Sequence, residues 1–195
     1  MGKIKYLQKI EEFIKKTPVV NIASIKQFLK NKSYAYILIR NLLAKGKLKK
    51  LTKGWYSAYD DPSLAVFCFK PAYLGLEDAL SFHGLWEQET IPVIVTTRKI
   101  RQGIRKIFGV NVLIRRINKK YYFGVDYIKY FDFYLPVSDV EKTFLDIVYF
   151  YKTIEPLLLR KFKKRMDFKR LKRYLSRYPK RFQIKVSRLL KQKIL

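Results

Sequence analysis

The stretch "LAKGKLKKLTKGWYSA", residues 43–58, decides the expected fold. Two short runs that suit β-strands, residues 48–52 and 55–59, flank a Lys53-Gly54 turn, which is typical of a β-hairpin. The hairpin is strongly cationic. An apolar helical pattern precedes it and ends at Gly46, because glycine readily adopts the left-handed conformation that closes a helix.

Three helical patterns lie upstream of this hairpin. Residues 4–14 carry apolar side chains at helical spacing and end before Thr17-Pro18, and residues 19–20 suit a short strand. Asn21 is the expected cap of a second helix, and Ser33 is the expected cap of a third at residues 34–45. Three helices followed by a hairpin predict a winged helix-turn-helix, in which the third helix enters the major groove and the hairpin, or wing, contacts phosphates.

This fold predicts a set of DNA-binding residues on the third helix and the wing. Arginine pairs with guanine, asparagine pairs with adenine, and tyrosine reaches phosphate, while lysines on phosphates release counterions. The expected contacts are Lys32, Ser33, Tyr34, Tyr36, Arg40, Asn41, Lys47, Lys49, Lys50 and Lys53. We expect Trp55 and Tyr56 to pack the wing onto the helices. The alternative is a core helix beside a merely solvated lysine face.

Charge divides the chain into three parts. The 195 residues include 43 Lys and Arg against 15 Asp and Glu, for a net charge of +28. Residues 1–60 carry +11, residues 61–155 carry +2, and residues 156–195 carry +15. Such an excess indicates a polyanionic partner. No apolar run is long enough to span a bilayer, and no signal peptide is evident, so we expect a cytoplasmic protein without a membrane partner.

We therefore expect an α+β protein with three domains: residues 1–60 form the winged helix, 61–155 a small mixed α/β domain, and 156–195 a basic helical tail. In the middle, residues 64–69, 91–97, 110–115, 121–125 and 128–135 suit strands, and residues 118–120 suit a hairpin turn. Residues 76–82 suit a helix that ends at Gly84. Ser138 and Glu141 have the spacing of a capping box that opens another helix.

The tail has a helical pattern that begins at a capping Asp167 and breaks at Pro179. Its expected phosphate-binding residues are Arg170, Arg173, Arg177, Lys180 and Arg181. These side chains suit DNA phosphates, structured RNA or an acidic protein. A solvated helix pair packed on the middle domain remains the plain alternative, and an RNA-binding or nuclease-accessory protein is the rival function.

Residues suited to catalysis are scarce. His83 is the sole histidine and sits before a glycine helix stop, so we expect a structural role and no zinc site. Cys68 lies in the apolar run "LAVFCF", which indicates a buried thiol. The Asp-x-Lys pattern of metal nucleases occurs only at residues 167–169, in the helical tail. We therefore expect no enzyme, no metal and no cofactor.

Three segments resemble one known family. They are "LLAKGKLKKLTKGWYSA", "PAYLGLEDALSFHGL", and "IPVIVTTRKI" followed downstream by "PVSDVEKTFLDIV", within residues 5–150. In this order they resemble the AbiEi-like antitoxins, transcriptional regulators of bacterial and archaeal abortive-infection (type IV) toxin-antitoxin systems. The resemblance implies repression of the protein's own operon by the N-terminal domain, and antitoxicity by the C-terminal domain. It also implies a nucleotidyltransferase-like toxin that forms no stable complex with the antitoxin.

Overall fold

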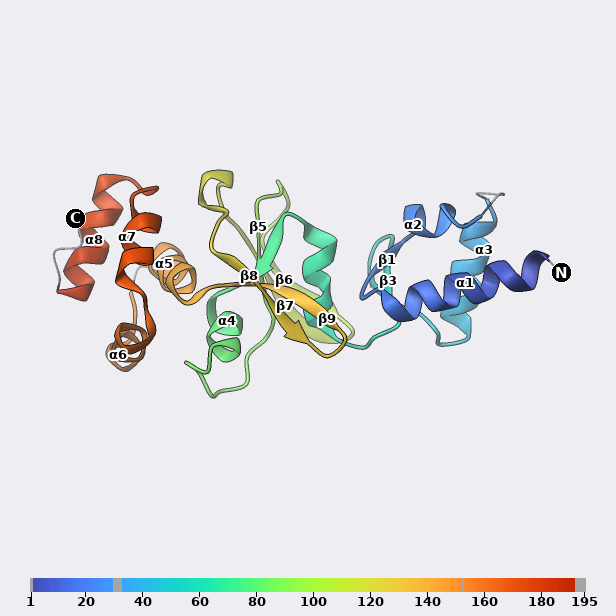
Figure 1. Cartoon of the computed structure of the whole chain (residues 1–195), viewed down its shortest axis with the longest axis horizontal. Coiled ribbons are helices and arrows are strands. Elements are labelled where there is room, and N and C mark those ends of the chain that lie inside the picture. Colours follow the sequence, from blue (N-terminus) through green and yellow to red (C-terminus); the bar gives the residue numbers. More distant parts are fainter. Residues whose placement is uncertain (1, 30–32, 152, 192–195) are drawn as a thin grey trace.

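The structure is a computed structural model that describes residues 2–29, 33–151 and 153–191, with side chains from Leu7 onward. Its N-terminal part contains three helices and a small antiparallel sheet of strand order β1-β3-β2 (Figure 1). These elements are α1 (Gly2–Lys16), β1 (Val20–Asn21), α2 (Ile22–Lys26), α3 (Tyr34–Ala44), β2 (Lys49–Thr52) and β3 (Trp55–Ser57). The predicted order of helices, short strand and hairpin is present.

The helix caps in this part agree only partly with the sequence patterns. Asn21 caps α2, as predicted, because its Oδ1 accepts a hydrogen bond from the backbone N–H of Ser24 at 2.8 Å. Ser33 occupies the N-cap position of α3 but has helical backbone angles, and its side chain makes no capping hydrogen bond. The predicted cap at Ser33 is therefore wrong.

The N-terminal helices share a hydrophobic cluster of their own. α3 buries one face against α1 and α2, because its apolar residues recur every three or four positions. The buried members of the cluster are Ile10, Ile14, Val20, Ile25, Ala35, Leu38, Ile39, Leu42 and Leu48. This packing leaves the other face of α3 in solvent.

A six-stranded mixed sheet forms the middle of the chain, with strand order β6-β7-β5-β4-β9-β8. Its strands are β4 (Ala72–Leu74), β5 (Val93–Thr96), β6 (Gly103–Ile107), β7 (Val110–Arg116), β8 (Val125–Tyr130) and β9 (Phe133–Ser138). The pairs β5–β7 and β4–β9 are parallel, and the other neighbours are antiparallel. Helix α4 (Leu76–Phe82) has the predicted bounds, and Gly84 follows it with a left-handed φ of 63°.

Four predictions for this region are wrong, namely the strands at residues 64–69, 121–125 and 128–135 and the turn at 118–120. Residues 122–124 form no regular element and β8 begins only at Val125, while residues 128–135 span the end of β8, a turn at 131–132 and the start of β9. The strand expected at residues 64–69 is instead a 3₁₀ helix, η1 (Pro62–Phe69), because Pro62 starts it and Asp61 accepts a hydrogen bond from the backbone N–H of Ser63 at 2.8 Å. The hairpin turn expected at residues 118–120 contributes to a second 3₁₀ helix, η2 (Lys119–Tyr121). The chain leaves the sheet there, since β7 pairs with β5 and β6, while β8 pairs with β9.

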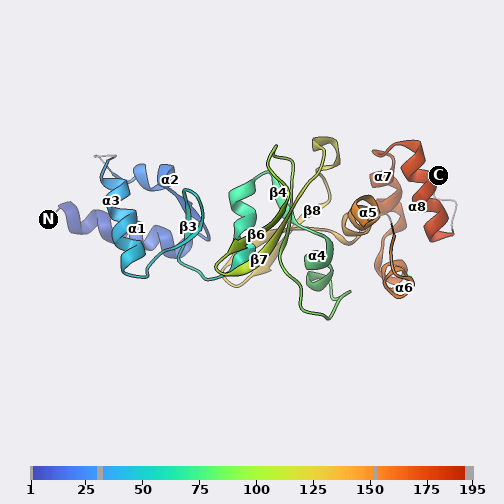
Figure 2. The ribbon, with the colours of Figure 1, turned by 180° about the vertical axis from the view of Figure 1, so that it is seen from behind.

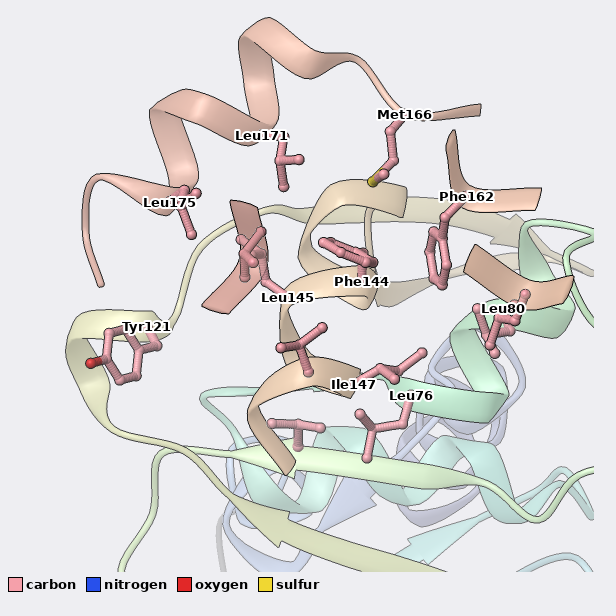
Figure 3. Close-up of a cluster of buried hydrophobic side chains, with 14 of the residues drawn as sticks. Leu76, Leu80, Tyr121, Phe144, Leu145, Ile147, Phe162, Met166, Leu171 and Leu175 are labelled. Atoms are coloured by element: carbon pink, nitrogen blue, oxygen red, sulfur yellow. The ribbon is translucent and has the colours of Figure 1, made fainter. Parts of the chain in front are cut away.

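Four helices complete the chain: α5 (Val140–Tyr151), α6 (Pro156–Arg165), α7 (Phe168–Leu175) and α8 (Lys180–Leu190). Asp167 caps α7, and Pro179 precedes α8, as predicted. Figure 3 shows Phe162, Leu171 and Leu175 of the tail helices packed with Phe144 and Leu145 of α5. The same cluster runs from Tyr73 in the sheet to Leu190 in α8, so the basic tail is a packed part of the C-terminal half.

The chain is thus a mixed α+β protein, as predicted. Figures 1 and 2 show the three-helix part at one end of the long axis, the six-stranded sheet in the middle, and α6 to α8 at the other end. Within the described residues, none of the helices has the length and apolar character that crossing a bilayer requires.

Candidate nucleic-acid interface

The solvent face of α3 carries a continuous stripe of side chains at helical spacing. Tyr36 is 59% exposed, Ile37 is 47% exposed, and Arg40, Asn41 and Ala44 are also exposed. These positions lie opposite the buried face of α3, because residues three and four apart share a face of a helix. The stripe therefore offers hydroxyl, guanidinium, amide and apolar groups together, which is the mixture that reads base edges in a major groove.

The residues predicted to contact DNA at the start of α3 differ in how far they are exposed to solvent. Ser33 is exposed beside the stripe, whereas Tyr34 is half-buried and packs against the N-terminal hydrophobic cluster. Lys32 lies outside the residues that the structure describes.

Sequence patterns missed two members of this surface, Lys26 and Ile37. The Lys26 ammonium donates a hydrogen bond to the Tyr36 hydroxyl at 3.4 Å and lies 4.7 Å from the centre of its ring. This contact adds a positive charge from α2 beside α3. The only signal for Ile37 in the sequence is that this apolar residue does not share the helix face of Leu38 and Leu42. The contact to Lys26 depends on how α2 packs beside α3, which spacing within one helix does not indicate.

The wing lysines fall into two groups. Lys47 forms an ion pair with Glu11 at 2.7 Å, and Lys49 forms an ion pair with Asp60. Lys50 and Lys53 are exposed, and in the described part of the chain neither has a carboxylate within ion-pair distance. The unneutralised charge of the wing therefore sits at Lys50 and Lys53.

The aromatic residues of the wing pack in two directions. Tyr56 contacts the N-terminal cluster, as expected, whereas Trp55 contacts the cluster that also holds η1 and the sheet. Tyr59 packs against Phe133 with ring centres 5.1 Å apart. The base of the wing thus touches the sheet as well as its own helices.

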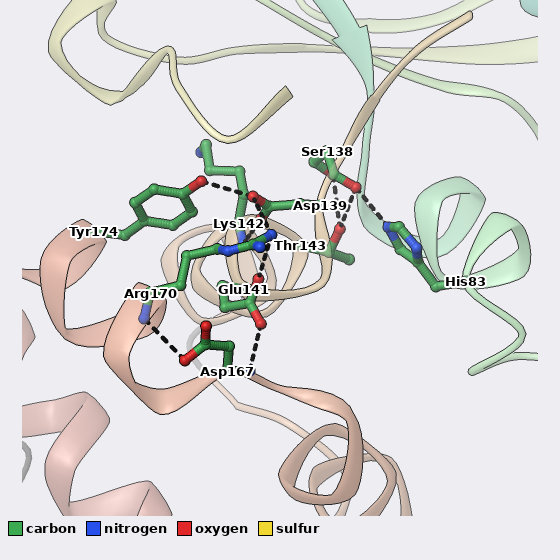
Figure 4. A network of polar contacts seen from close by, with 9 residues as sticks. All are labelled: His83, Ser138, Asp139, Glu141, Lys142, Thr143, Asp167, Arg170 and Tyr174. Carbon is green, nitrogen blue, oxygen red and sulfur yellow. Dashed lines mark hydrogen bonds and ion pairs between the residues drawn. The ribbon is translucent and has the colours of Figure 1, made fainter. Parts of the chain in front are cut away.

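The basic residues predicted to bind phosphate in the tail differ in whether their side chains already contact other residues. Arg170 lies 3.7 Å from a carboxylate oxygen of Asp139 and 3.6 Å from one of Glu141 (Figure 4). Glu141 is the main cause of the raised pKa of Arg170. Arg177 lies over the ring of Phe123 at 4.5 Å, and Arg173, Lys180 and Arg181 are exposed. Three of the five predicted residues are therefore plainly open to solvent without such contacts.

The acidic residues near the start of α5 serve the structure. Asp139 caps the helix, since its Oδ1 accepts a hydrogen bond from the backbone N–H of Lys142 at 2.7 Å. Ser138 instead shares a hydrogen bond with Thr143, and Glu141 accepts one from the backbone N–H of Asp167 at 2.6 Å (Figure 4). The predicted Ser138–Glu141 capping box is therefore wrong. Burial raises the pKa of both Asp139 and Glu141.

The lone histidine is half-buried and the lone cysteine is buried. His83 ends α4, and its Nε2 donates a hydrogen bond to the carbonyl oxygen of Ser138 at 2.6 Å. Cys68 is buried as predicted, and this burial raises the pKa of its thiol to about 12. A thiol with so high a pKa is a poor nucleophile at neutral pH.

Comparison with known proteins gives a likeness at the level of the fold. No family model matches the chain, and no curated protein matches its sequence. A crystal structure of the RV2827C protein from Mycobacterium tuberculosis is similar, with a TM-score of 0.62 and 16% sequence identity. The match covers 96% of this chain and 76% of that chain. At this identity the likeness shows a shared fold.

Proposed function

We propose that this protein is a winged helix-turn-helix repressor that binds duplex DNA through α3 and the β2–β3 wing. The observation that carries the proposal is the exposed stripe of Tyr36, Arg40 and Asn41 on α3. The order of three helices and a three-stranded sheet is the one in which such a helix reads a major groove. Lys50 and Lys53 then contact phosphates beside the groove.

The resemblance to AbiEi-like antitoxins supplies the biological setting of this proposal. The repressor acts on its own operon in a type IV toxin-antitoxin pair, and the C-terminal half counters a nucleotidyltransferase-like toxin without a stable complex. It works in the cytoplasm as a binding protein and performs no catalysis. The net charge of +28 supports a polyanionic partner.

Footprinting on the DNA upstream of the gene tests the repressor proposal. The full chain should protect a defined site, and R40A/N41A should lose that protection while retaining non-specific binding. Each lost base contact weakens specific binding by about 1–3 kcal/mol. The matched control is K106Q/K129Q, which removes two exposed lysines from the sheet. Equal protection by R40A/N41A and the full chain would refute base reading by α3.

A second candidate is RNA binding through the tail. Residues 156–195 carry 16 basic residues and one acidic residue, Asp167, whose carboxylate caps α7. Exposed Arg173, Lys180 and Arg181 suit the phosphates of structured RNA. Competition between duplex DNA and a structured RNA distinguishes the two functions. The variant R173Q/K180Q/R181Q should reduce only RNA binding if the tail serves RNA, and R40A/N41A should reduce only specific DNA binding.

A further inference from the structure

A surface hollow lies where the parallel strands β5 and β7 end. Thr96 pairs with Arg116 at the carboxyl ends of these strands, and the segments that follow rise from the same edge of the sheet (Figures 1 and 2). The hollow measures about 590 Å³ and is lined by Pro71, Thr97, Arg98, Lys99, Lys119 and Tyr122. Small-molecule sites have volumes of this order, and parallel strands commonly hold ligands beyond their carboxyl ends.

Hydrogen bonds fix the floor of the hollow. The buried hydroxyl of Thr96 lies 2.7 and 3.0 Å from the carbonyl oxygens of Phe69 and Pro71 and shares its one proton between them. The backbone N–H of Thr97 also donates to Pro71, at 3.2 Å, and that of Arg98 donates to the Thr96 hydroxyl at 3.1 Å. Two of the three segments that line the hollow, those of Pro71 and of residues 97–99, are thus joined before any ligand arrives, which lowers the cost of ordering the site on binding.

Three cationic side chains line this hollow without a balancing carboxylate. In the described part of the chain, no Asp or Glu oxygen lies within ion-pair distance of Arg98, Lys99 or Lys119. One nitrogen of the Arg98 guanidinium is anchored on the carbonyl oxygen of Cys68, at 3.0 Å, which leaves its other N–H groups to bind a ligand. Such a group favours a multiply charged anion.

An aromatic ring lies beside these charges. Tyr122 is half-buried and packs against Tyr73 with ring centres 5.8 Å apart, so its position is constrained. It follows η2, whose Lys119 also lines the hollow. An aromatic face next to phosphate-binding charges is the combination that holds a nucleobase together with its phosphates.

We propose that this hollow is a binding site for a nucleoside triphosphate. Arg98, Lys99 and Lys119 contact the phosphates, and the ring of Tyr122 stacks on the base. The concave shape and the gathering of three charges around one hollow favour a small ligand over the extended backbone of a duplex. The site is built by the segments beyond the ends of the strands and shares no residue with α3 or the wing, so its ligand binding can be tested separately from DNA binding.

Calorimetric titration of the full chain with ATP, GTP, CTP and UTP tests this proposal. At least one of these should bind saturably, and K99Q/K119Q should weaken it by about tenfold or more for each lost charge-assisted contact. The control K106Q/K129Q removes the same charge from exposed positions on β6 and β8 and should leave the affinity within about twofold. The variant K49Q/K50Q, which alters only the wing, should retain nucleotide binding. The nucleotide proposal can therefore fail while the DNA-binding proposal stands, and the reverse.

The contribution of the ring is tested separately. Y122L should weaken the nucleotide but leave binding of inorganic triphosphate unchanged. Should Y122L not fold, tighter binding of the nucleotide than of inorganic triphosphate by the unaltered chain would support stacking. Three results would overturn the proposal: no saturable nucleotide binding, an equal loss in K106Q/K129Q, or a K99Q/K119Q defect confined to duplex DNA. The last would assign the hollow to a DNA phosphate.

Discussion

Lys142 and Asp146 form an ion pair inside the core of the C-terminal half, where both side chains are 0% exposed. The Tyr73 hydroxyl donates to the other oxygen of Asp146 at 2.6 Å, and the Lys142 ammonium lies 5.2 Å from the centre of the Phe123 ring. Burial lowers the pKa of Lys142 and raises that of Asp146. Both partners of the pair lie on α5, and the Tyr73 hydroxyl of β4, by its hydrogen bond to Asp146, joins this helix to the sheet.

Removing one partner of this pair should be strongly destabilising. K142M leaves the Asp146 carboxylate buried without a cation, with only the Tyr73 hydroxyl as its partner, so we expect a loss of about 3–5 kcal/mol in the free energy of unfolding. The double variant K142M/D146L should recover much of this loss, because an apolar pair leaves no charge uncompensated. Urea denaturation of the single and double variants measures both effects. A cost below about 1 kcal/mol for K142M would mean that the pair contributes little.

Asp78 should make stability depend on pH. It is buried, and this burial raises its pKa from 3.8 to about 7, although the backbone N–H of Val93 donates to it at 3.4 Å. The folded protein therefore holds a proton that the unfolded chain releases above about pH 4. The free energy of unfolding should fall as pH rises from about 4 to 7, by up to about 1.4 kcal/mol per pH unit.

The variant D78N isolates this contribution, since its amide oxygen can still accept from Val93. It should exceed the unaltered protein in stability at pH 8 and lose that advantage near pH 4. Thermal unfolding at a series of pH values provides the measurement. Parallel curves for the two proteins would show that folding does not raise the pKa of Asp78.

The ion pair between Lys49 and Asp60 should restrain DNA binding by the wing. D60N frees Lys49 for a phosphate, so affinity should rise and the salt dependence should steepen by up to about 0.9 in log–log slope. K50Q should weaken binding more than K49Q does, because Lys49 is already neutralised. Fluorescence anisotropy across a range of salt concentrations measures these slopes. The control E87Q changes an exposed acid on a distant loop and should have little effect.

Gly124 should tolerate no side chain. Its φ is +62°, and a Cβ there would lie 2.8 Å from the Cβ of Lys142 and 2.9 Å from the ring of Tyr174. G124A should therefore cost about 1–3 kcal/mol of overpacking beyond the backbone strain. G109A supplies the comparison, since Gly109 also has a positive φ, but a Cβ added to it would meet no atom within 4 Å. Equal melting temperatures for the two variants would contradict this expectation.

Local patterns predicted local structure well. The bounds of α4, the cap at Asp167 and the glycine after α4 were readable because each depends on neighbouring residues. The apolar run at residues 64–69 was misassigned, since a buried 3₁₀ helix and a buried strand share the same composition.

Local sequence patterns could not predict contacts between residues that are far apart in the sequence. The exposed stripe of α3 followed from helical spacing, but the pairing of Lys47 with Glu11 depends on how α1 packs beside the wing. The hollow at the end of β5 likewise joins Pro71, Lys99 and Lys119 through sheet order alone. Sequence therefore indicated which charges exist, and the fold decides which of them are balanced.

The extent of two of the hydrophobic clusters, the N-terminal one and the one that spans the sheet and the tail, has a consequence for synthesis on the ribosome. The N-terminal cluster is complete at Tyr56, so its helices can assemble while most of the chain is still being translated. The C-terminal cluster joins Tyr73 to Leu190 and therefore forms only after α8 has been translated. A nascent chain can therefore pack α3 into its cluster before the C-terminal half is made, and premature termination after Tyr56 should leave the N-terminal helices folded on their own.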